Sequence, residues 1–100
     1  MRSARRVLGV VLAALALGAC GPVIYTSAVN KAESALVDAR ENNAHWYAPY
    51  EYHYAQANLD KAYEEASRAE YEDAVKLARA ALDYAGRALR IAERQRFEEP

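Results

Sequence analysis

The chain has few of the residues that usually interrupt or crosslink a small protein. Among its 100 residues there are one cysteine, three prolines and four glycines. A single cysteine cannot form a disulfide within the chain, which excludes the disulfide frameworks of small secreted domains. Few glycines and prolines leave few positions for turns. The sequence therefore predicts one small domain built from a few long elements.

The main body of the sequence also lacks an excess of basic residues. Three of the 13 basic residues are Arg2, Arg5 and Arg6, and from Cys20 onward ten basic residues stand against 14 acidic ones, a net charge of −4. Non-specific nucleic-acid binding needs clustered lysine and arginine to neutralise phosphates. We therefore expect no nucleic-acid partner.

The apolar run near the N-terminus, Val7–Leu17, is too short to span a membrane. A spanning helix needs about 20 apolar residues to cross a hydrocarbon core of ~30 Å. The run follows three arginines and precedes Gly18 and Ala19. A basic start, a short apolar stretch and small residues are together typical of a secretory signal. We therefore expect residues 1–19 to be a signal peptide that is removed.

The four residues Leu17-Gly18-Ala19-Cys20 resemble the lipobox of bacterial lipoproteins. In that family the cysteine sulfur takes a diacylglycerol, the signal is cut just before it, and the new amino terminus is often acylated. Each buried methylene contributes about 0.8 kcal/mol, so two or three acyl chains hold a small protein at a membrane. The resemblance implies that Cys20 is lipidated. The alternatives are a buried cysteine in an uncleaved helix and an ordinary soluble secreted protein. In these lipoproteins an aspartate just after the cysteine favours retention in the inner membrane. This chain has Gly21 there, so the resemblance implies the outer membrane, on the side that faces the periplasm.

The sequence predicts a short tether after Cys20 and then a first helix. Residues 20–27 contain a Gly-Pro pair and are expected to be extended, with Thr26 or Ser27 as the N-cap of a helix that runs to about Asn43. Asn42 and Asn43 tolerate the left-handed conformation that ends helices. The residues on the expected buried face recur every three or four positions: Val29, Ala32, Leu36 and Ala39.

Two further helices are expected from Pro49, which disfavours the helical conformation at Ala48 and suits the first turn of a helix. The second helix runs to about Arg68 and presents a stripe of Tyr52, Ala55, Leu59, Ala62, Tyr63 and Ala66. The third helix runs to about Arg96, so we expect its end to extend past the helices that cover it. Its expected contact seam has heptad spacing and consists of Tyr71, Val75, Ala78, Leu82, Ala85, Leu89 and Ala92. We therefore predict an all-α domain over residues 28–100, an antiparallel helical hairpin or three-helix bundle.

The run Tyr47-Ala48-Pro49-Tyr50-Glu51 and the segments 55–62 and 70–85 resemble an alanine-rich helical domain of bacterial envelope lipoproteins. That uncharacterised family opens on Tyr-Ala-Pro-x-Glu and has glycines near two turns, where this chain has Asn43 and Ala69. The resemblance covers residues 35–93 and implies the fold and the location. It implies no activity, because the function of the family is unknown.

The second half of the chain is also similar to a single tetratricopeptide helix pair. The positions that match are Leu59, Ala62, Tyr63, Tyr71, Ala74, Ala78, Ala81 and Leu82. One pair cannot form a repeat array, which needs about three repeats. The similarity implies at most that the pair binds a peptide or another helix.

An aromatic cluster gives the best candidate for a binding site. Five aromatic side chains fall within nine residues: Trp46, Tyr47, Tyr50, Tyr52 and Tyr54. Positions 50, 52 and 54 point to different faces of a helix, so we expect some of the rings to be exposed. Exposed tyrosine and tryptophan are enriched in binding hot spots. The cluster is interpreted as a partner-binding site, with lipid headgroup contact and core packing as alternatives.

No pattern in the sequence predicts a catalytic or metal site. His45 and His53 flank Pro49 without the paired spacing of zinc ligands, and no serine has a recognisable base nearby. We therefore expect no enzyme, no cofactor and no metal. The predicted function is a noncatalytic, membrane-anchored adaptor or structural protein of the bacterial envelope that binds an envelope protein or the cell wall. The alternative is an envelope enzyme, or an enzyme subunit, that acts on peptidoglycan.

Overall fold

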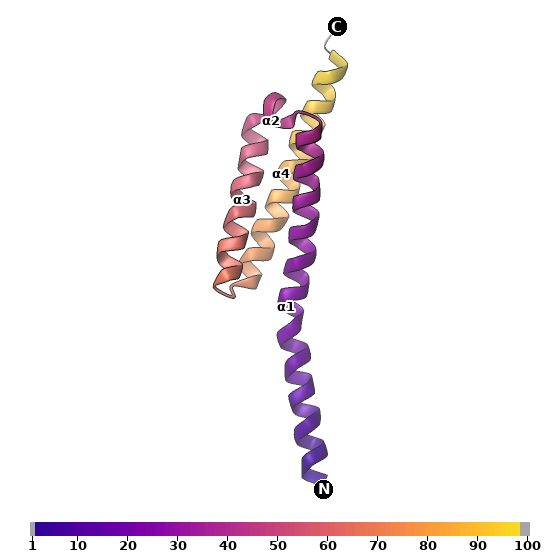
Figure 1. Cartoon of the computed structure of the whole chain (residues 1–100), viewed down its shortest axis with the longest axis vertical. Coiled ribbons are helices and arrows are strands. Elements are labelled where there is room, and N and C mark those ends of the chain that lie inside the picture. The colour runs from indigo at the N-terminus through magenta and orange to yellow at the C-terminus, as the bar shows by residue number, and fades with distance from the viewer. Residues whose placement is uncertain (1, 99–100) are drawn as a thin grey trace.

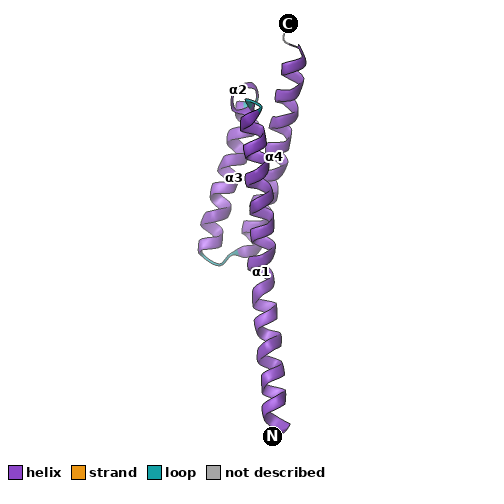
Figure 2. Cartoon of the chain, turned by 45° about the vertical axis from the view of Figure 1, so that its right-hand side comes forward, coloured by secondary structure: helices purple, strands orange, loops and turns teal. Residues whose placement is uncertain are grey.

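The computed structural model describes the backbone of residues 2–98 and the side chains of residues 4–10 and 20–98. Over this range the chain forms four helices and no strand (Figures 1 and 2). The helices are α1 (Arg2–Glu41), α2 (Ala44–Tyr47), α3 (Pro49–Ser67) and α4 (Tyr71–Glu98). The predicted all-α fold class is confirmed.

Three long helices form the bundle, and α4 packs against both of the others. In Figure 1, α1 and α4 run in one direction and α3 runs in the opposite one, while the short α2 lies at the end where α1 finishes. The N-terminal half of α1 projects beyond the bundle at one end, and the last turns of α4 project at the other. Residues 93–98 of α4 are exposed, as expected for a helix longer than its partners. The molecule is thin, with principal extents of 78 × 22 × 14 Å.

Alanine dominates the core, which lets the helices approach closely. The fully buried alanines of α4 alternate steps of four and three residues: Ala74, Ala78, Ala81, Ala85, Ala88 and Ala92. Larger side chains flank this alanine seam, with Tyr84 against α3 and Leu82 beside α1. The predicted seam is wrong at Tyr71, Leu82 and Leu89, which are half-buried. Because α4 has a neighbour on each side, its buried face centres on the alanines between the two flanks.

The ends of α1 and α3 use residues in the left-handed conformation. Asn43 follows α1 with φ 61° and ψ 30°, as the sequence predicts. Ala69 follows α3 with φ 61°. There the Ala69 N–H donates to the Ala66 carbonyl at 2.9 Å, and the Glu70 N–H donates to the Glu65 carbonyl at 2.9 Å. This pair of bonds is the Schellman motif, which satisfies carbonyls that the end of a helix leaves open.

The predicted extended tether at residues 20–27 is wrong, because α1 continues through Pro22. Thr26 is inside the helix, where its hydroxyl donates to the Pro22 carbonyl at 2.8 Å, and it is not an N-cap. Packing explains the continuity: a Cβ placed on Gly21 would lie 3.5 Å from Tyr71 of α4, and the rings of Tyr25 and Tyr71 lie 5.9 Å apart. Contact with α4 thus outweighs the local cost of a proline in a helix.

A hydrogen bond joins α1 to α3 at the edge of the core. The Tyr63 hydroxyl donates to the Glu33 carboxylate. Partial burial, then the bond to Glu33, raises the pKa of Tyr63 well above its usual value. Tyr63 was predicted to belong to the buried stripe of α3, but its side chain is exposed at the rim. The predicted stripe is confirmed at Tyr52, Ala55, Leu59 and Ala62, whereas Ala66 is half-buried. All four predicted α1 positions are buried: Val29, Ala32, Leu36 and Ala39.

The predicted signal peptide, residues 1–19, lies only partly within the described part of the chain. The side chains of residues 4–10 are exposed, whereas Met1 and the side chains of residues 2, 3 and 11–19 lie outside it. Glu99 and Pro100, the last residues of the predicted domain, also lie outside. Within the described residues, no helix has an apolar stretch long enough to cross a bilayer.

Candidate functional site: an aromatic surface at one end of the bundle

The predicted aromatic cluster lies on α2 and the first turns of α3, at the end of the bundle where α1 finishes (Figure 1). Cys20 is exposed at the other end of the packed part of α1. With a helical rise of 1.5 Å per residue, the stretch of α1 from Cys20 to Glu41 is about 32 Å long. The aromatic cluster and the cysteine are therefore separated by the full length of the bundle.

The five aromatic residues divide between the core and the solvent. Trp46 is 78% exposed, Tyr50 67% and Tyr54 43%. Tyr52 is buried and Tyr47 is partly buried against the core. The interpretation of the cluster as core packing therefore holds for Tyr52 and Tyr47, and the prediction that some rings are exposed is confirmed. Three rings remain accessible for a partner.

Two of the exposed rings continue into α4 as a connected series. Tyr50 and Tyr54 stack with their ring centroids 5.9 Å apart and an interplanar angle of 12°. Tyr54 then meets Tyr84 of α4 edge to face, with the centroids 4.4 Å apart. The Arg87 guanidinium lies 4.7 Å from the centroid of Tyr84, a cation–π contact. We call Trp46, Tyr50, Tyr54, Tyr84 and Arg87 the aromatic surface.

Tyr84 and Arg87 were missed in the sequence, although one signal points to them. Tyr84 lies seven residues after Leu77 and seven before Ile91, and all three pack beside the alanine seam. Heptad spacing alone therefore places Tyr84 on a flank of α4. Heptad spacing does not define how α4 is rotated about its own axis. This rotation decides which flank of α4 faces α3. Arg87 then follows from Tyr84, because side chains three apart on a helix are neighbours.

An ion pair fixes Arg87 at the edge of the aromatic surface. Its guanidinium lies 2.9 Å from the Asp83 carboxylate, one turn earlier on α4. Both side chains are about half exposed, so the pair contributes little to stability. It does hold the guanidinium over the Tyr84 ring. A partner at this surface would therefore meet aromatic rings with a positioned cation beside them.

The two histidines near the aromatic surface contact aromatic rings. The ring of His45 lies 5.8 Å from that of Tyr52, and the ring of His53 lies 5.4 Å from it, edge on. Across the described residues, no group of three or more histidine, cysteine, aspartate or glutamate side chains is arranged to hold a metal ion. This geometry supports the interpretation of His45 and His53 as surface and packing residues.

The serines have local structural contacts or line open grooves. The Ser67 hydroxyl donates to the Glu64 carbonyl within the last turn of α3. Ser27 and Ser34 line shallow grooves beside α1. The residues that line these two grooves include Lys31 and Asp38 and no histidine.

Comparison with known proteins adds no relative. No family model matches the chain, and no curated protein or solved structure matches it. The resemblance to the envelope lipoprotein domain therefore stays a prediction.

Proposed function

We propose that this chain is a noncatalytic adaptor of the bacterial envelope, anchored through lipidated Cys20 in the outer membrane and facing the periplasm. It binds an envelope protein partner through the aromatic surface. The observation that carries the proposal is the exposure of Trp46 and Tyr50 at the end of the bundle opposite Cys20. The anchor and the binding surface are thus separate, and each is available while the other is occupied.

The composition of the aromatic surface supports protein binding. Tryptophan, tyrosine and arginine are the residue types most enriched among interface hot spots. The large rings of tryptophan and tyrosine bury much area on binding while these side chains lose little conformational entropy. Tyr54 and Tyr84 support the Tyr50 ring from behind, so part of the ordering cost of binding is already met in the free protein.

The position of Cys20 supports the anchor. Gly21 of α1 lies against α4, where a Cβ would meet Tyr71 at 3.5 Å. In Figure 1 the part of α1 before this point projects away from α3 and α4. Removal of residues 1–19 would therefore leave the bundle whole, with the acylated residue at its first position. An exposed cysteine there is accessible to modification.

Site-specific crosslinking in the native membrane tests the proposal. A photoreactive amino acid replaces Trp46 in one variant and Val37, an exposed residue of α1, in a control. We expect one defined protein to be crosslinked from position 46 and not from position 37. The double substitution of Tyr50→Ala and Tyr54→Ala should then reduce the crosslinking yield, because loss of a hot-spot ring typically costs at least about 2 kcal/mol, roughly 30-fold in affinity.

Three results would contradict the adaptor. One is equal crosslinking from both positions. Another is a crosslinking yield from position 46 that the double substitution leaves unchanged, as the Val37→Ala control also leaves it. The third is the release of muropeptides from purified cell wall by the protein, which would favour the enzyme alternative. Recovery of the cell wall itself from position 46 would keep the adaptor role but replace the protein partner with the wall.

A further inference from the structure

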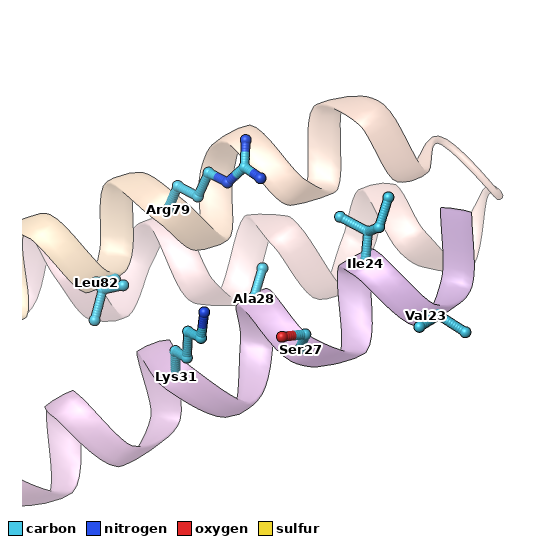
Figure 3. Close-up of a pocket in the computed structure, with 7 residues that line it drawn as sticks. All are labelled: Val23, Ile24, Ser27, Ala28, Lys31, Arg79 and Leu82. Carbon is cyan, nitrogen blue, oxygen red and sulfur yellow. The ribbon is translucent and has the colours of Figure 1, made fainter. Parts of the chain in front are cut away.

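A second surface lies between α1 and α4, whereas the aromatic surface lies where α4 meets α3. It is a groove of about 360 Å³, formed by Val23, Ile24, Ser27, Ala28, Lys31, Arg79 and Leu82. Figure 3 shows Lys31 and Arg79 on opposite walls, from α1 and α4, with Ala28 between them. The groove begins within one helical turn of Cys20.

The groove combines exposed apolar side chains with two cations. Val23 is 66% exposed and Ile24 is 48% exposed, although both are large apolar residues. Neither Lys31 nor Arg79 has an ion-pair partner among the described residues. Apolar side chains at one end and two cations further along form a surface that matches an amphiphile with an anionic head.

The charges around the groove leave this cationic character in place. Glu72 borders the end nearest Cys20, where its carboxylate lies 3.7 Å from the Lys76 ammonium. Asp38 lines the far end, beyond Lys31. Glu72 and Asp38 thus lie at the two ends, and Asp83, one turn after Arg79 on α4, is paired with Arg87. The middle of the groove holds Lys31 and Arg79 in a body whose net charge from Cys20 onward is −4.

We propose that this groove binds one anionic phospholipid of the membrane that holds the lipid anchor. The phosphate lies between Lys31 and Arg79, and the glycerol and first methylenes lie along Ile24 and Val23 toward the membrane. The proposal rests on the proposed lipidation of Cys20, because the anchor brings the groove to the headgroup layer. Lys31 lies eleven residues after Cys20, about 16 Å along α1, so a headgroup phosphate reaches it when this face of the bundle lies along the membrane surface.

The bound phospholipid has a structural consequence for the anchored protein. An acylated Cys20 alone would let the bundle tilt about this residue in any direction. A headgroup held between α1 and α4 fixes one face of the bundle toward the membrane. It thereby directs the aromatic surface, on α2, α3 and α4, at a defined orientation away from the bilayer.

Native mass spectrometry of the full protein, purified from membranes in detergent, tests the proposal. Phosphatidylglycerol is added as the probe, with phosphatidylcholine in a parallel sample. We expect one phosphatidylglycerol to be retained per chain, with weaker retention of phosphatidylcholine. The variant with Lys31→Glu and Arg79→Glu should retain phosphatidylglycerol at least about tenfold less, because two charge-assisted contacts are lost. Ile24→Gln should lower retention while leaving both cations.

The matched control carries Lys61→Glu and Arg94→Glu, which make the same change in net charge at exposed sites outside the groove. We expect it to retain the lipid as the unaltered protein does. All four substituted cations are exposed, and circular dichroism checks that each variant keeps its helix content. Equal loss in the control, or equal retention in the groove variant, would overturn the proposal. A lipid-free dimer that the groove variant abolishes would make the occupant a second copy and also overturn it.

The same spectra separate this proposal from the proposed function. The covalent mass reports whether Cys20 is acylated and residues 1–19 are removed. A chain of unmodified mass that retains phosphatidylglycerol would contradict the proposed lipidation of Cys20 and support the proposed lipid binding in the groove. An acylated chain without retained lipid would contradict the groove and keep the anchor.

Discussion

At the scale of single residues, Ala69 holds a conformation that suits glycine better. Its φ of 61° places it in the left-handed region, where a Cβ atom crowds the following carbonyl at a cost of roughly 1–2 kcal/mol. Two hydrogen bonds of the Schellman motif keep it there. Asn43 occupies the same region with less strain, because asparagine tolerates it. The turn between α3 and α4 is therefore the more strained of the two.

We predict that Ala69→Gly stabilises the protein by about 1 kcal/mol, because glycine adopts a positive φ without the steric cost. Chemical denaturation followed by circular dichroism measures the change in the free energy of unfolding. Ala57→Gly, at an exposed position inside α3, is the control and should destabilise by about 1 kcal/mol. Destabilisation by both substitutions would show that Ala69 is unstrained.

At the scale of the elements, the alanine seam sets how close α4 comes to its neighbours. Ala78, Ala81 and Ala85 are fully buried, so no room remains for a longer side chain at these positions. The flanking Tyr84 and Leu82 supply the bulk that alanine lacks. Much of the apolar area therefore lies beside the helix contacts, where larger side chains bridge from one helix to the next.

We predict that Ala81→Leu destabilises the protein by about 1–3 kcal/mol, because the added atoms push α4 away from its partners. Ala57→Leu adds the same atoms at an exposed position of α3 and should leave the free energy of unfolding within about 0.5 kcal/mol. Thermal and urea unfolding measure both variants. A stability unchanged by Ala81→Leu would show that the seam is loosely packed.

The end of α1 and the start of α3 could be predicted from the sequence because local chemistry determines them. Asn43 marks the end and Pro49 marks the start. The continuation of α1 through Pro22 could not be predicted in this way, because it depends on Tyr71, far away in the sequence. The contact between Tyr54 and Tyr84 depends likewise on how α4 is rotated against α3. The cluster of aromatic residues along the sequence identified the exposed rings of α2 and α3. The part that α4 contributes to the aromatic surface depends on how the helices pack.

At the scale of the whole molecule, the bundle buries a small core for its length. Its shortest dimension is 14 Å, close to the diameter of one helix with its side chains. Each of the three long helices is therefore needed to cover the others. The part of α1 before Gly21, in contrast, projects away from the bundle (Figure 1).

We predict that a chain starting at Gly21 keeps the helical bundle and unfolds in one cooperative transition. The reason is that the buried α1 residues Val29, Ala32, Leu36 and Ala39 all remain. Circular dichroism during heating measures this. A chain starting at Asn42, which lacks α1, is the control and should lose the cooperative transition. The same loss in the chain starting at Gly21 would show that the preceding segment is required for folding.

The heptad pattern of the alanine seam makes the length of this molecule adjustable. Seven residues added at matching levels of α1, α3 and α4 would repeat one layer of the seam and keep each flank facing its partner. Such an insertion would move the aromatic surface about 10 Å farther from Cys20 while leaving both ends chemically unchanged. The bundle is in this sense a spacer of defined height, and the number of layers determines how far from its anchor the protein reaches.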